Sequence, residues 1–452
     1  MSSKIGNLFI VMNIDTEGPA TETLVHTFNR VKNIFGIDLE PTRDNLARLQ
    51  RGDIPAIDEE TRLGLRVMLA PDRLQYINNW EQMDEMLDRF MSAKCRKDVP
   101  DSFGNGYVYS FFIRDLVDYD VNPRRVAIGY HHVYDFYREK IDSLSSSDKL
   151  YWHYHAPGIV RHAHLDGLNL ANTNHHVQGL AHRVIDRLDF PACYRPGMDH
   201  IRPDYNLFLE MWIPFDYSNQ AIELTAEDLS QKDNEVGRYG DWRRAPREWC
   251  IYHPDIFDHQ KQGQMKRYIA RCLYAKGRMR VITQAEVDSA FARAAGGKDT
   301  ILSYLCHDSR DMTLDIAAVN PLIRNAAAKF PNVVFSYQNA VDAMRRALQL
   351  APQSPPAFEI KWHGNRLDIT SDKKLWGSQP FFCFSTWSGQ YFHDNLDKHS
   401  DTEWSYFFDW QSLDRRAIAR IGIASNDDFG NTTVMRLDME SAQIEIRQRN
   451  QW

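Results

Sequence analysis

The sequence lacks the features that would place it in several common classes of protein. Its six cysteines are scattered over 452 residues and no CxxC pair occurs, which argues against a zinc knuckle or a thioredoxin-like redox motif. No apolar stretch is long enough to span a bilayer, and the opening residues do not resemble a secretory signal. We therefore expect a cytoplasmic protein with reduced thiols.

Excess charge of one sign is also missing. The formal net charge is -7, with 54 basic and 61 acidic residues, so the sequence gives no reason to expect a nucleic acid or an acidic membrane as partner. The chain has no Walker A loop, no GxGxxG after a strand, no HExxH and no GxSxG elbow. The chain therefore lacks the commonest sequence motifs of nucleotide binding and of hydrolysis, but hydrolases that use other motifs are not excluded.

The chain is longer than one core usually supports, so we expect two domains. Short apolar runs alternate with segments of helical spacing through residues 1–350, which predicts an α/β domain with a parallel sheet or barrel. The predicted strands are Leu8–Met12, Tyr107–Ile113, Lys149–His155, Ala192–Tyr194, Ile213–Tyr217, Thr300–Cys306 and Val333–Ser336. The predicted helices include Glu22–Phe35, Asp58–Leu69, Val126–Ile141, Leu180–Leu188, Tyr205–Met211, Gln264–Tyr274, Gln284–Ala295, Leu314–Phe330 and Gln338–Leu350, with Asn79 as the N-cap of a further one.

The pattern changes at Ala351–Pro356, whose sequence APQSPP is the best linker in the chain. Beyond it, short alternating strands predict a β-sandwich-like accessory domain over residues 357–452. This region is rich in tryptophan: Trp362, Trp376, Trp387, Trp404 and Trp410. Such residues form a sugar-binding platform or fill the core of the sandwich, and the sequence leaves both open.

The first strand carries the candidate chemistry. It reads LFIVMNIDTEGP, and Asp15 and Glu17 follow its apolar run, two residues apart. On an extended backbone, residues i and i+2 point to the same side. Two carboxylates so close require a cation or a shared proton. A solvated loop with an Asx-turn is the alternative.

A second pair of candidate ligands ends the third strand, KLYWHYH. His153 and His155 are again two residues apart, so both imidazoles and a carboxylate of a neighbouring strand could share one divalent ion. The alternative is that these histidines are satisfied polar residues at a barrel rim. The second choices for a ligand are His162, His164, His175 and His176.

Two further candidates follow later strands. Arg195 could hold a catalytic carboxylate in its ionised form, or form a salt bridge with a loop acid. His307 ends the TILSYLC strand, where a histidine is well placed as a general acid, or serves as a cap. His131 and His132 lie in a predicted helix and are interpreted as structural.

In this order, the motifs NIDTEGP, WHYHAPG, YRPGM and LCHD resemble those of the NodB-homology polysaccharide deacetylases, carbohydrate esterase family 4. The segment LFLEMWIPFDYS also resembles the part of the family that follows its Arg motif. The family's adjacent Asp-Asp is here Asp-x-Glu, as in a divergent branch, and its His-Ser-x-x-His spacing is here His-x-His. The resemblance covers roughly Leu8 to Leu350.

The resemblance implies a distorted (β/α) barrel and a set of roles. Asp15 would be the general base, Arg195 would orient it, and His307 would protonate the leaving group. The family's Asp-Trp motif, which tunes the acid histidine, would correspond to Asp241-Trp242.

By the same resemblance, Glu17, His153 and His155 would hold a divalent metal ion. The metal would be zinc, or alternatively cobalt or manganese. Because the spacing of the histidines departs from that of the family, the identity of the second histidine ligand stays open.

The sequence therefore predicts a metal-dependent hydrolase that removes an acetyl group from an N-acetylated sugar or glycan intermediate, in polysaccharide biosynthesis. A hydrolase of another C–N bond or of a glycosidic bond is one alternative. A non-catalytic carbohydrate-binding or assembly protein on the same fold is the other. The sequence predicts no oligomeric state.

Overall fold

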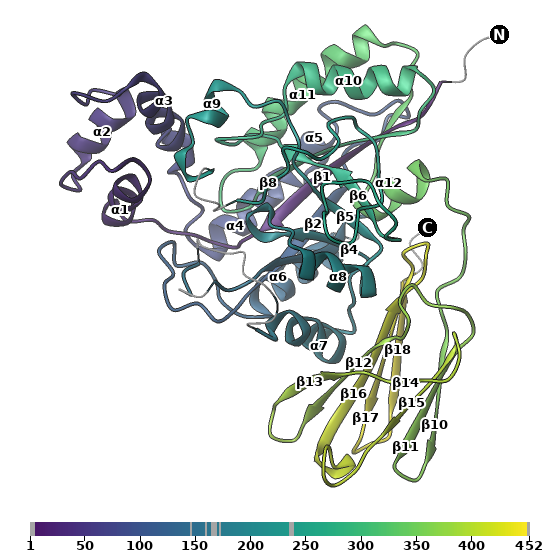
Figure 1. Ribbon diagram of the computed structural model, residues 1–452. Helices are drawn as coiled ribbons and strands as arrows, with labels where there is room; N and C mark the ends of the chain where they lie inside the picture. Colours follow the sequence, from purple (N-terminus) through teal and green to yellow (C-terminus); the bar gives the residue numbers. More distant parts are fainter. Residues whose placement is uncertain are drawn as a thin grey trace.

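The computed structural model describes residues 5–144, 147–158, 161–163, 170, 173–234 and 239–449. A parallel β-sheet forms the centre of the first part of the chain (Figure 1). Its strands are β1 (Leu8–Thr16), β2 (Tyr109–Leu116), β3 (Lys149–His155), β4 (Cys193–Pro196), β5 (Phe215–Asn219), β6 (Tyr268–Arg271), β7 (Leu273–Tyr274), β8 (Thr300–His307) and β9 (Phe335–Tyr337).

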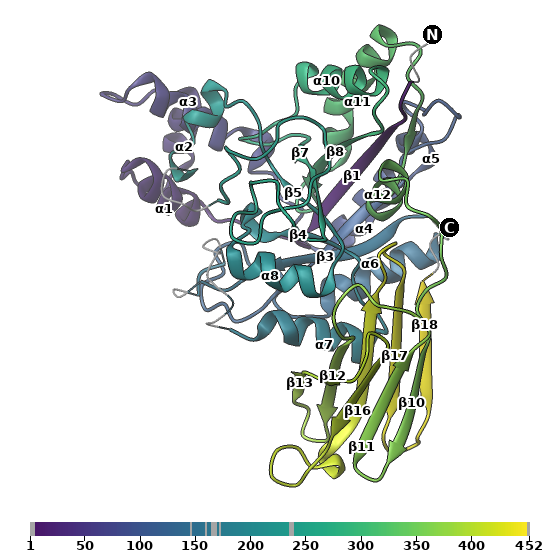
Figure 2. The same cartoon turned by 45° about the vertical axis from the view of Figure 1, so that its right-hand side comes forward.

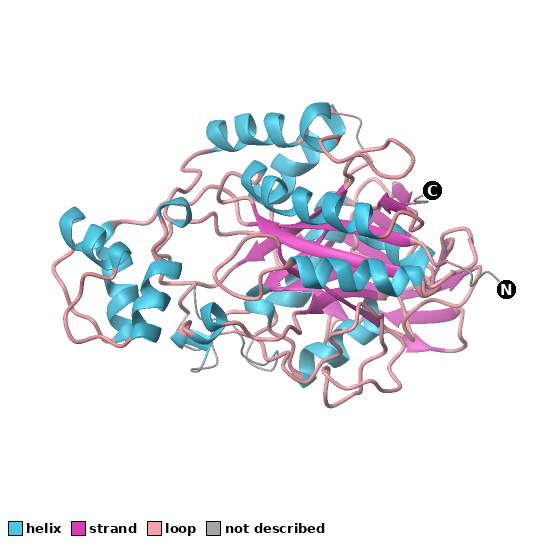
Figure 3. Ribbon diagram, turned by 90° about the horizontal axis from the view of Figure 1, so that it is seen from above, coloured by secondary structure: helices cyan, strands magenta, loops and turns pink. Residues whose placement is uncertain are grey.

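The strand order is β6-β5-β4-β3-β2-β1-β8-β7, and β9 pairs with the amino-terminal end of β1. The sheet curls until β6 and β8 come into contact, which makes a nearly closed barrel with helices around it (Figure 3). The prediction of an α/β barrel followed by an all-β region is confirmed. Because every pairing in this sheet is parallel, the carboxyl ends of its strands lie at one rim.

β1 runs through the middle of this sheet. All nine of its residues are buried, including the polar Asn13, Asp15 and Thr16. A strand covered on both faces reads as a continuous apolar run, which is why LFIVM precedes the polar residues. The polar residues come only where the strand reaches the rim.

The helices of the described residues are α1 (Leu24–Phe35), α2 (Arg43–Arg51), α3 (Glu59–Met68), α4 (Trp80–Phe90), α5 (Ala93–Arg96), α6 (His132–Ser143), α7 (His175–Arg187), α8 (Pro203–Trp212), α9 (Ala226–Leu229), α10 (Gln284–Ala295), α11 (Thr313–Lys329) and α12 (Ala340–Ala347). One of them begins at a polar cap that was predicted from the sequence. Asn79 accepts a hydrogen bond from the backbone N–H of Gln82 at the start of α4. The predicted helix Gln284–Ala295 has the observed bounds of α10.

One helix prediction was wrong and another was wrong in part. Residues 264–274 contain no helix and include β6 and β7 instead, because Ile269, Ala270, Cys272 and Leu273 are all buried, as suits a strand between two layers. The helix predicted from Val126 begins only at His132. Asn122 binds both backbone polar groups of Val126, and this local turn replaces the first helical turns.

The helices α1, α2 and α3 form a lobe at one side of the barrel (Figure 2). They follow β1 and pack mainly on one another around an apolar cluster of their own. Its fully buried members include Val31, Leu49 and Leu65. The sequence did not predict α2, which is short, strongly charged and buries only Leu49.

The strands after residue 357 form two antiparallel sheets, β10-β11-β15-β14 and β13-β12-β16-β17-β18. Their bounds are β10 (Phe358–His363), β11 (Arg366–Ser371), β12 (Phe381–Thr386), β13 (Tyr391–Asp394), β14 (Asp397–Lys398), β15 (Glu403–Phe407), β16 (Ile418–Asn426), β17 (Thr432–Asp438) and β18 (Ile444–Arg449). Both sheets contribute to one apolar core, with Leu367 and Ile369 from one and Phe382 and Ile421 from the other. They therefore pack face to face.

The sandwich shares a second apolar cluster with the barrel. Phe381, Cys383 and Ala424 of the sandwich join Leu180 and Val184 of α7 in it. The backbone approach is close, because a Cβ atom at Gly422 would lie 2.5 Å from Cγ1 of Val184. The barrel and the sandwich are thus joined by a buried interface.

The tryptophans of this region have different environments. Trp376 and Trp404 are buried, and Trp376 donates from Nε1 to the Glu210 carbonyl of α8 at 3.0 Å. Trp387 and Trp410 are 58% and 79% exposed. A shared platform of all five tryptophans is therefore absent, and part of the set serves the core. Among the described residues, no helix has the length and apolarity needed to cross a membrane.

Candidate functional site

The sequence-predicted residues come together at the carboxyl rim of the parallel sheet. Asp15 on β1 is the register partner of His307 on β8, and His153 on β3 is the partner of Arg195 on β4. Asp15, Glu17, both histidines of β3 and His307 line one cavity of about 310 Å³. The parallel topology thus juxtaposes residues as distant in the chain as Asp15 and His307, which are 292 positions apart.

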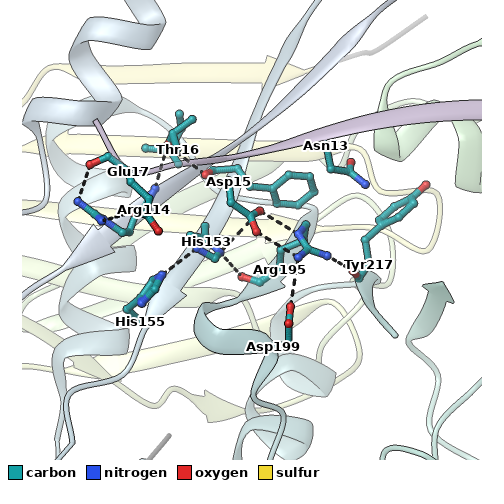
Figure 4. A network of polar contacts seen from close by, with 12 residues as sticks. Asn13, Asp15, Thr16, Glu17, Arg114, His153, His155, Arg195, Asp199 and Tyr217 are labelled. Carbon is teal, nitrogen blue, oxygen red and sulfur yellow. Dashed lines mark hydrogen bonds and ion pairs between the residues drawn. The ribbon is translucent and has the colours of Figure 1, made fainter. Parts of the chain in front are cut away.

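Asp15 and Arg195 form a two-point ion pair in the interior. Nε of Arg195 donates to Oδ1 at 2.8 Å and Nη2 donates to Oδ2 at 3.1 Å, as Figure 4 shows. Arg195 also donates to the Tyr217 carbonyl and lies 3.5 Å from Asp199. Burial alone would raise the pKa of Asp15, but Arg195 and then His153 outweigh it and lower the pKa. The carboxylate is therefore ionised at neutral pH.

The two histidines of β3 face each other. Nδ1 of His153 lies 3.1 Å from the Arg195 carbonyl oxygen, so it carries the proton and donates. Nε2 of His153 is then unprotonated, and it forms a 2.9 Å hydrogen bond with Nε2 of His155, with the rings at 85°. Two imidazole nitrogens about 2.05 Å from one tetrahedral zinc ion would be about 3.3 Å apart, so a small rotation of the rings would let both nitrogens bind one ion.

The protonation state of His153 suits a ligand. Burial lowers its pKa to about 3, and the positive charge of Arg195 acts in the same direction against the attraction of Asp15. The imidazole is therefore neutral at physiological pH, which is the form that binds metal. The closeness of the two Nε2 atoms and the neutral state of His153 therefore fit the binding of a divalent cation.

Glu17 is turned away from this pair. Its Oε2 lies 3.8 Å from Nη1 of Arg114, and Figure 4 shows the carboxylate on the side of that arginine. The donor atoms of Glu17, His153 and His155 do not all lie within 4.8 Å of one another. Burial would raise the pKa of Glu17, but His307 and Arg114 lower it to about 2. Its part as a metal ligand stays a prediction.

The one trio of potential ligands whose donor atoms do meet that distance, among the described residues, is His131, His182 and Asp186. It lies at the junction of α6, α7 and the sandwich. Oδ2 of Asp186 is 3.2 Å from Nε2 of His131 and 2.9 Å from Nδ1 of His182, and Oδ1 accepts from the Tyr391 hydroxyl at 2.7 Å. These contacts form a hydrogen-bonded network that joins the two parts of the chain.

His307 is positioned by an aromatic ring and by its neighbour in the chain. Its imidazole stacks on Tyr274, with centroids 5.8 Å apart and planes at 12°. Burial lowers the pKa of His307, against the attraction of Glu17 and Asp15. The next residue, Asp308, accepts hydrogen bonds from the backbone N–H groups of Glu17 at 2.6 Å and Gly18 at 3.0 Å. The rims of β1 and β8 are thereby tied together.

Asp241 does not contact this histidine. Its carboxylate is bound by Arg243, with Oδ1 and Oδ2 each 2.9 Å from a guanidinium nitrogen. Trp242 is buried and donates from Nε1 to the Asp199 carbonyl at 2.9 Å. The motif therefore acts on the loop after β4 through its tryptophan.

Sequence reasoning missed two residues of this site. Arg114 extends β2 beyond its apolar run, is buried, and donates to the Glu17 carbonyl at 2.6 Å. Asp199 lies behind Arg195, at a positive φ of 55° that non-glycine residues seldom adopt. A charged residue directly after a strand run was the available signal for Arg114, and no sequence signal marked Asp199.

The second-choice histidines lie elsewhere or outside the described residues. Nε2 of His175 is 3.5 Å from Asp118, and His176 packs edge-on against Phe208. His162 forms an isolated bridge with Val121. His164 lies outside the described residues.

No family model, no curated protein and no solved structure matches the chain. The likeness to polysaccharide deacetylases consequently depends on the motifs and their order. The structure defines a class of site: an α/β barrel whose rim holds an acid–arginine pair beside two facing imidazoles.

Proposed function

We propose that the chain is a metal-dependent hydrolase of the polysaccharide deacetylase type, which removes an acetyl group from an N-acetylated sugar or glycan intermediate. The observation that carries the proposal is the convergence of the Asp15–Arg195 ion pair and the facing Nε2 atoms of His153 and His155 at one rim. The order of the motifs supports the same class.

His153 and His155 would hold the cation through Nε2, and Glu17 is the proposed third ligand. A divalent ion bound there would polarise a carbonyl group and lower the pKa of a water molecule toward neutrality. The observation in favour of this use is that the Arg195 carbonyl fixes the tautomer of His153, a second contact that metal-ligating histidines usually have.

The proton transfers are assigned to Asp15 and His307. Asp15 accepts a proton from the water that attacks the acetyl carbon, and its low pKa keeps it ready to do so at neutral pH. As the C–N bond breaks, the proton that Asp15 removed from the water passes by way of His307 to the departing amine, so both groups regain their starting forms and acetate is the second product. Arg195 positions the base and offsets its charge throughout.

Cleavage of a glycosidic bond is less well supported by these contacts. A glycosidase needs a pair of carboxyl groups that flank the scissile bond, whereas the second carboxylate of this rim, Glu17, lies on the side of Arg114. Hydrolysis of another C–N bond uses the same groups and is separated from deacetylation by the substrate alone.

Acetate release tests the proposal. The purified protein, loaded in turn with zinc, cobalt and manganese, should release acetate from N-acetylated sugars or oligosaccharides. Asp15→Asn should lower the rate by about two to four orders of magnitude, the usual loss of a general base. Asp241→Asn, whose side chain contacts Arg243 instead, serves as the matched control. Retention of sugars without turnover in every metal form would favour the binding protein.

A further inference from the structure

Five arginines gather in the cavity beyond the catalytic rim. They come from five separate segments: Arg30 of α1, Arg73 of the 3-10 turn Pro71–Arg73, Arg124 before α6, Arg278 after β7 and Arg310 after β8. The ring of Tyr76 lies between two of them, with the guanidinium carbons of Arg124 and Arg310 at 5.4 Å and 5.1 Å from its centroid. All five line the same cavity as Asp15 and Glu17.

The cluster holds more positive charge than its acids balance. Arg30 and Arg124 share Glu22, at 3.0 Å and 3.4 Å, and Arg278 pairs with Asp233. Within the described part of the chain, neither Arg73 nor Arg310 lies within 4 Å of a carboxylate oxygen. The five arginines thus carry five positive charges, and only two carboxylates, those of Glu22 and Asp233, form ion pairs with them.

Most other acids of the cavity pair with cations outside this group of five arginines. Asp15 and Asp199 pair with Arg195, and Glu17 lies 3.8 Å from Arg114. Asp72 pairs with Lys276, and Asp311 lies 3.5 Å from Arg89. Burial raises the pKa of Asp315 to about 7, so this side chain carries at most part of a charge at neutral pH. The arginine cluster therefore makes the electrostatic potential in the cavity positive.

Several donors of the cluster are buried without an acceptor. Nε of Arg30 and Nη1 of Arg73 have no hydrogen-bond partner among the described residues. Burial lowers the pKa of each of these arginines to about 10, and the neighbouring arginines add to the effect. Buried donors without partners cost about 1–3 kcal/mol each, and this cost adds to the mutual repulsion of the arginines, which a bound anion would offset.

We propose that this cluster is an anion subsite that binds a phosphate or pyrophosphate group. A phosphate carries up to two charges and several acceptor oxygens, which suits an excess of three cations better than a single carboxylate does. If the proposed function holds, the substrate is an N-acetylated sugar linked to this group, with the acetyl end at the rim. Arg124 acts on the charge of Glu17, and Arg310 follows His307 by three residues, so one ligand can reach both regions.

Binding of inorganic pyrophosphate tests the subsite without turnover. Calorimetric titration of protein stripped of metal on a chelating resin should show one site whose affinity falls with added potassium chloride. Arg73→Gln and Arg310→Gln should each weaken binding about tenfold or more. Arg416→Gln, an exposed arginine of the sandwich, should leave it unchanged. Melting curves of all variants verify that they are folded.

Three outcomes would overturn the subsite. The first is that the metal-free protein does not bind pyrophosphate. The second is that both arginine variants bind pyrophosphate as tightly as the unaltered protein does. The third is that glucuronate binds as tightly as pyrophosphate. None of these depends on acetate release, so a failure of the proposed hydrolase leaves this result standing. Where acetate is released, Arg73→Gln should lower kcat/KM for N-acetylglucosamine 1-phosphate about tenfold and leave that for N-acetylglucosamine unchanged.

Discussion

Arg195 donates hydrogen bonds to both carboxylate oxygens of Asp15, at 2.8 Å and 3.1 Å, and the two residues are 0% and 2% exposed. Because the pair is so deeply buried, little water could solvate the charge of one residue if the other were removed. The arrangement keeps the base ionised and fixes its direction, and it makes each residue dependent on the other.

Removing one partner of this pair should therefore destabilise the protein strongly. Arg195→Gln should lower the free energy of unfolding by about 3–5 kcal/mol, because Asp15 is left charged and buried. Urea unfolding followed by fluorescence and circular dichroism measures the change. The double variant Asp15→Asn with Arg195→Gln should recover a large part of the loss. If the double variant is as unstable as the sum of the two single ones, the pair is not coupled.

A second prediction concerns where a metal binds. His153→Ala should abolish stoichiometric zinc, since it removes one of the two facing Nε2 donors. His182→Ala, from the trio at the barrel–sandwich junction, should leave the zinc content unchanged and lower the thermal stability instead. Metal analysis after dialysis against limiting zinc distinguishes the sites, and the reverse pattern would move the metal to the junction.

The sequence was informative where a single strand carried the signal. Asp15, His153, Arg195 and His307 each end an apolar run, and parallel topology brings such ends to one rim whatever lies between them. The sequence does not determine side-chain rotamers. Glu17 was placed with the imidazoles by resemblance to the family, and in this structure its carboxylate lies on the side of Arg114, a residue of another strand.

Long-range packing also explains the other misses. The segment that contains Ile269 fits both helical and strand spacing, and only its burial between layers selects the strand. The arginine cluster could not be read from the sequence, because its members are up to 280 positions apart and meet only through the α1–α3 lobe and three loops. The β-strands after residue 357 were predictable, whereas their docking on α7 was not.

The interface between barrel and sandwich gives a third prediction. Gly422→Ala should lower the free energy of unfolding by about 1–3 kcal/mol, because the added Cβ atom would lie 2.5 Å from Val184 and 2.8 Å from Sγ of Cys383. Gly296→Ala is the matched control, since its Cβ atom would meet its neighbours at 3.4 Å, an ordinary contact. Urea denaturation measures both, and equal stability of the two variants would contradict the tight interface.

The last prediction is a pH dependence of stability at the same interface. His393 of β13 lies between Trp212 and Phe381, with ring centroids at 5.7 Å and 4.6 Å. Burial lowers its pKa to about 4, against a usual value of 6.5. Between these values the unfolded chain binds more protons than the folded one, so stability rises with pH. The cost of keeping His393 neutral is absent above pH 6.5, grows as the pH falls to about 4, and reaches on the order of 3 kcal/mol. His393→Phe keeps the ring packing and should flatten this part of the profile. The exposed His363→Phe should retain it, and parallel slopes for all three proteins would show that His393 is not the group responsible.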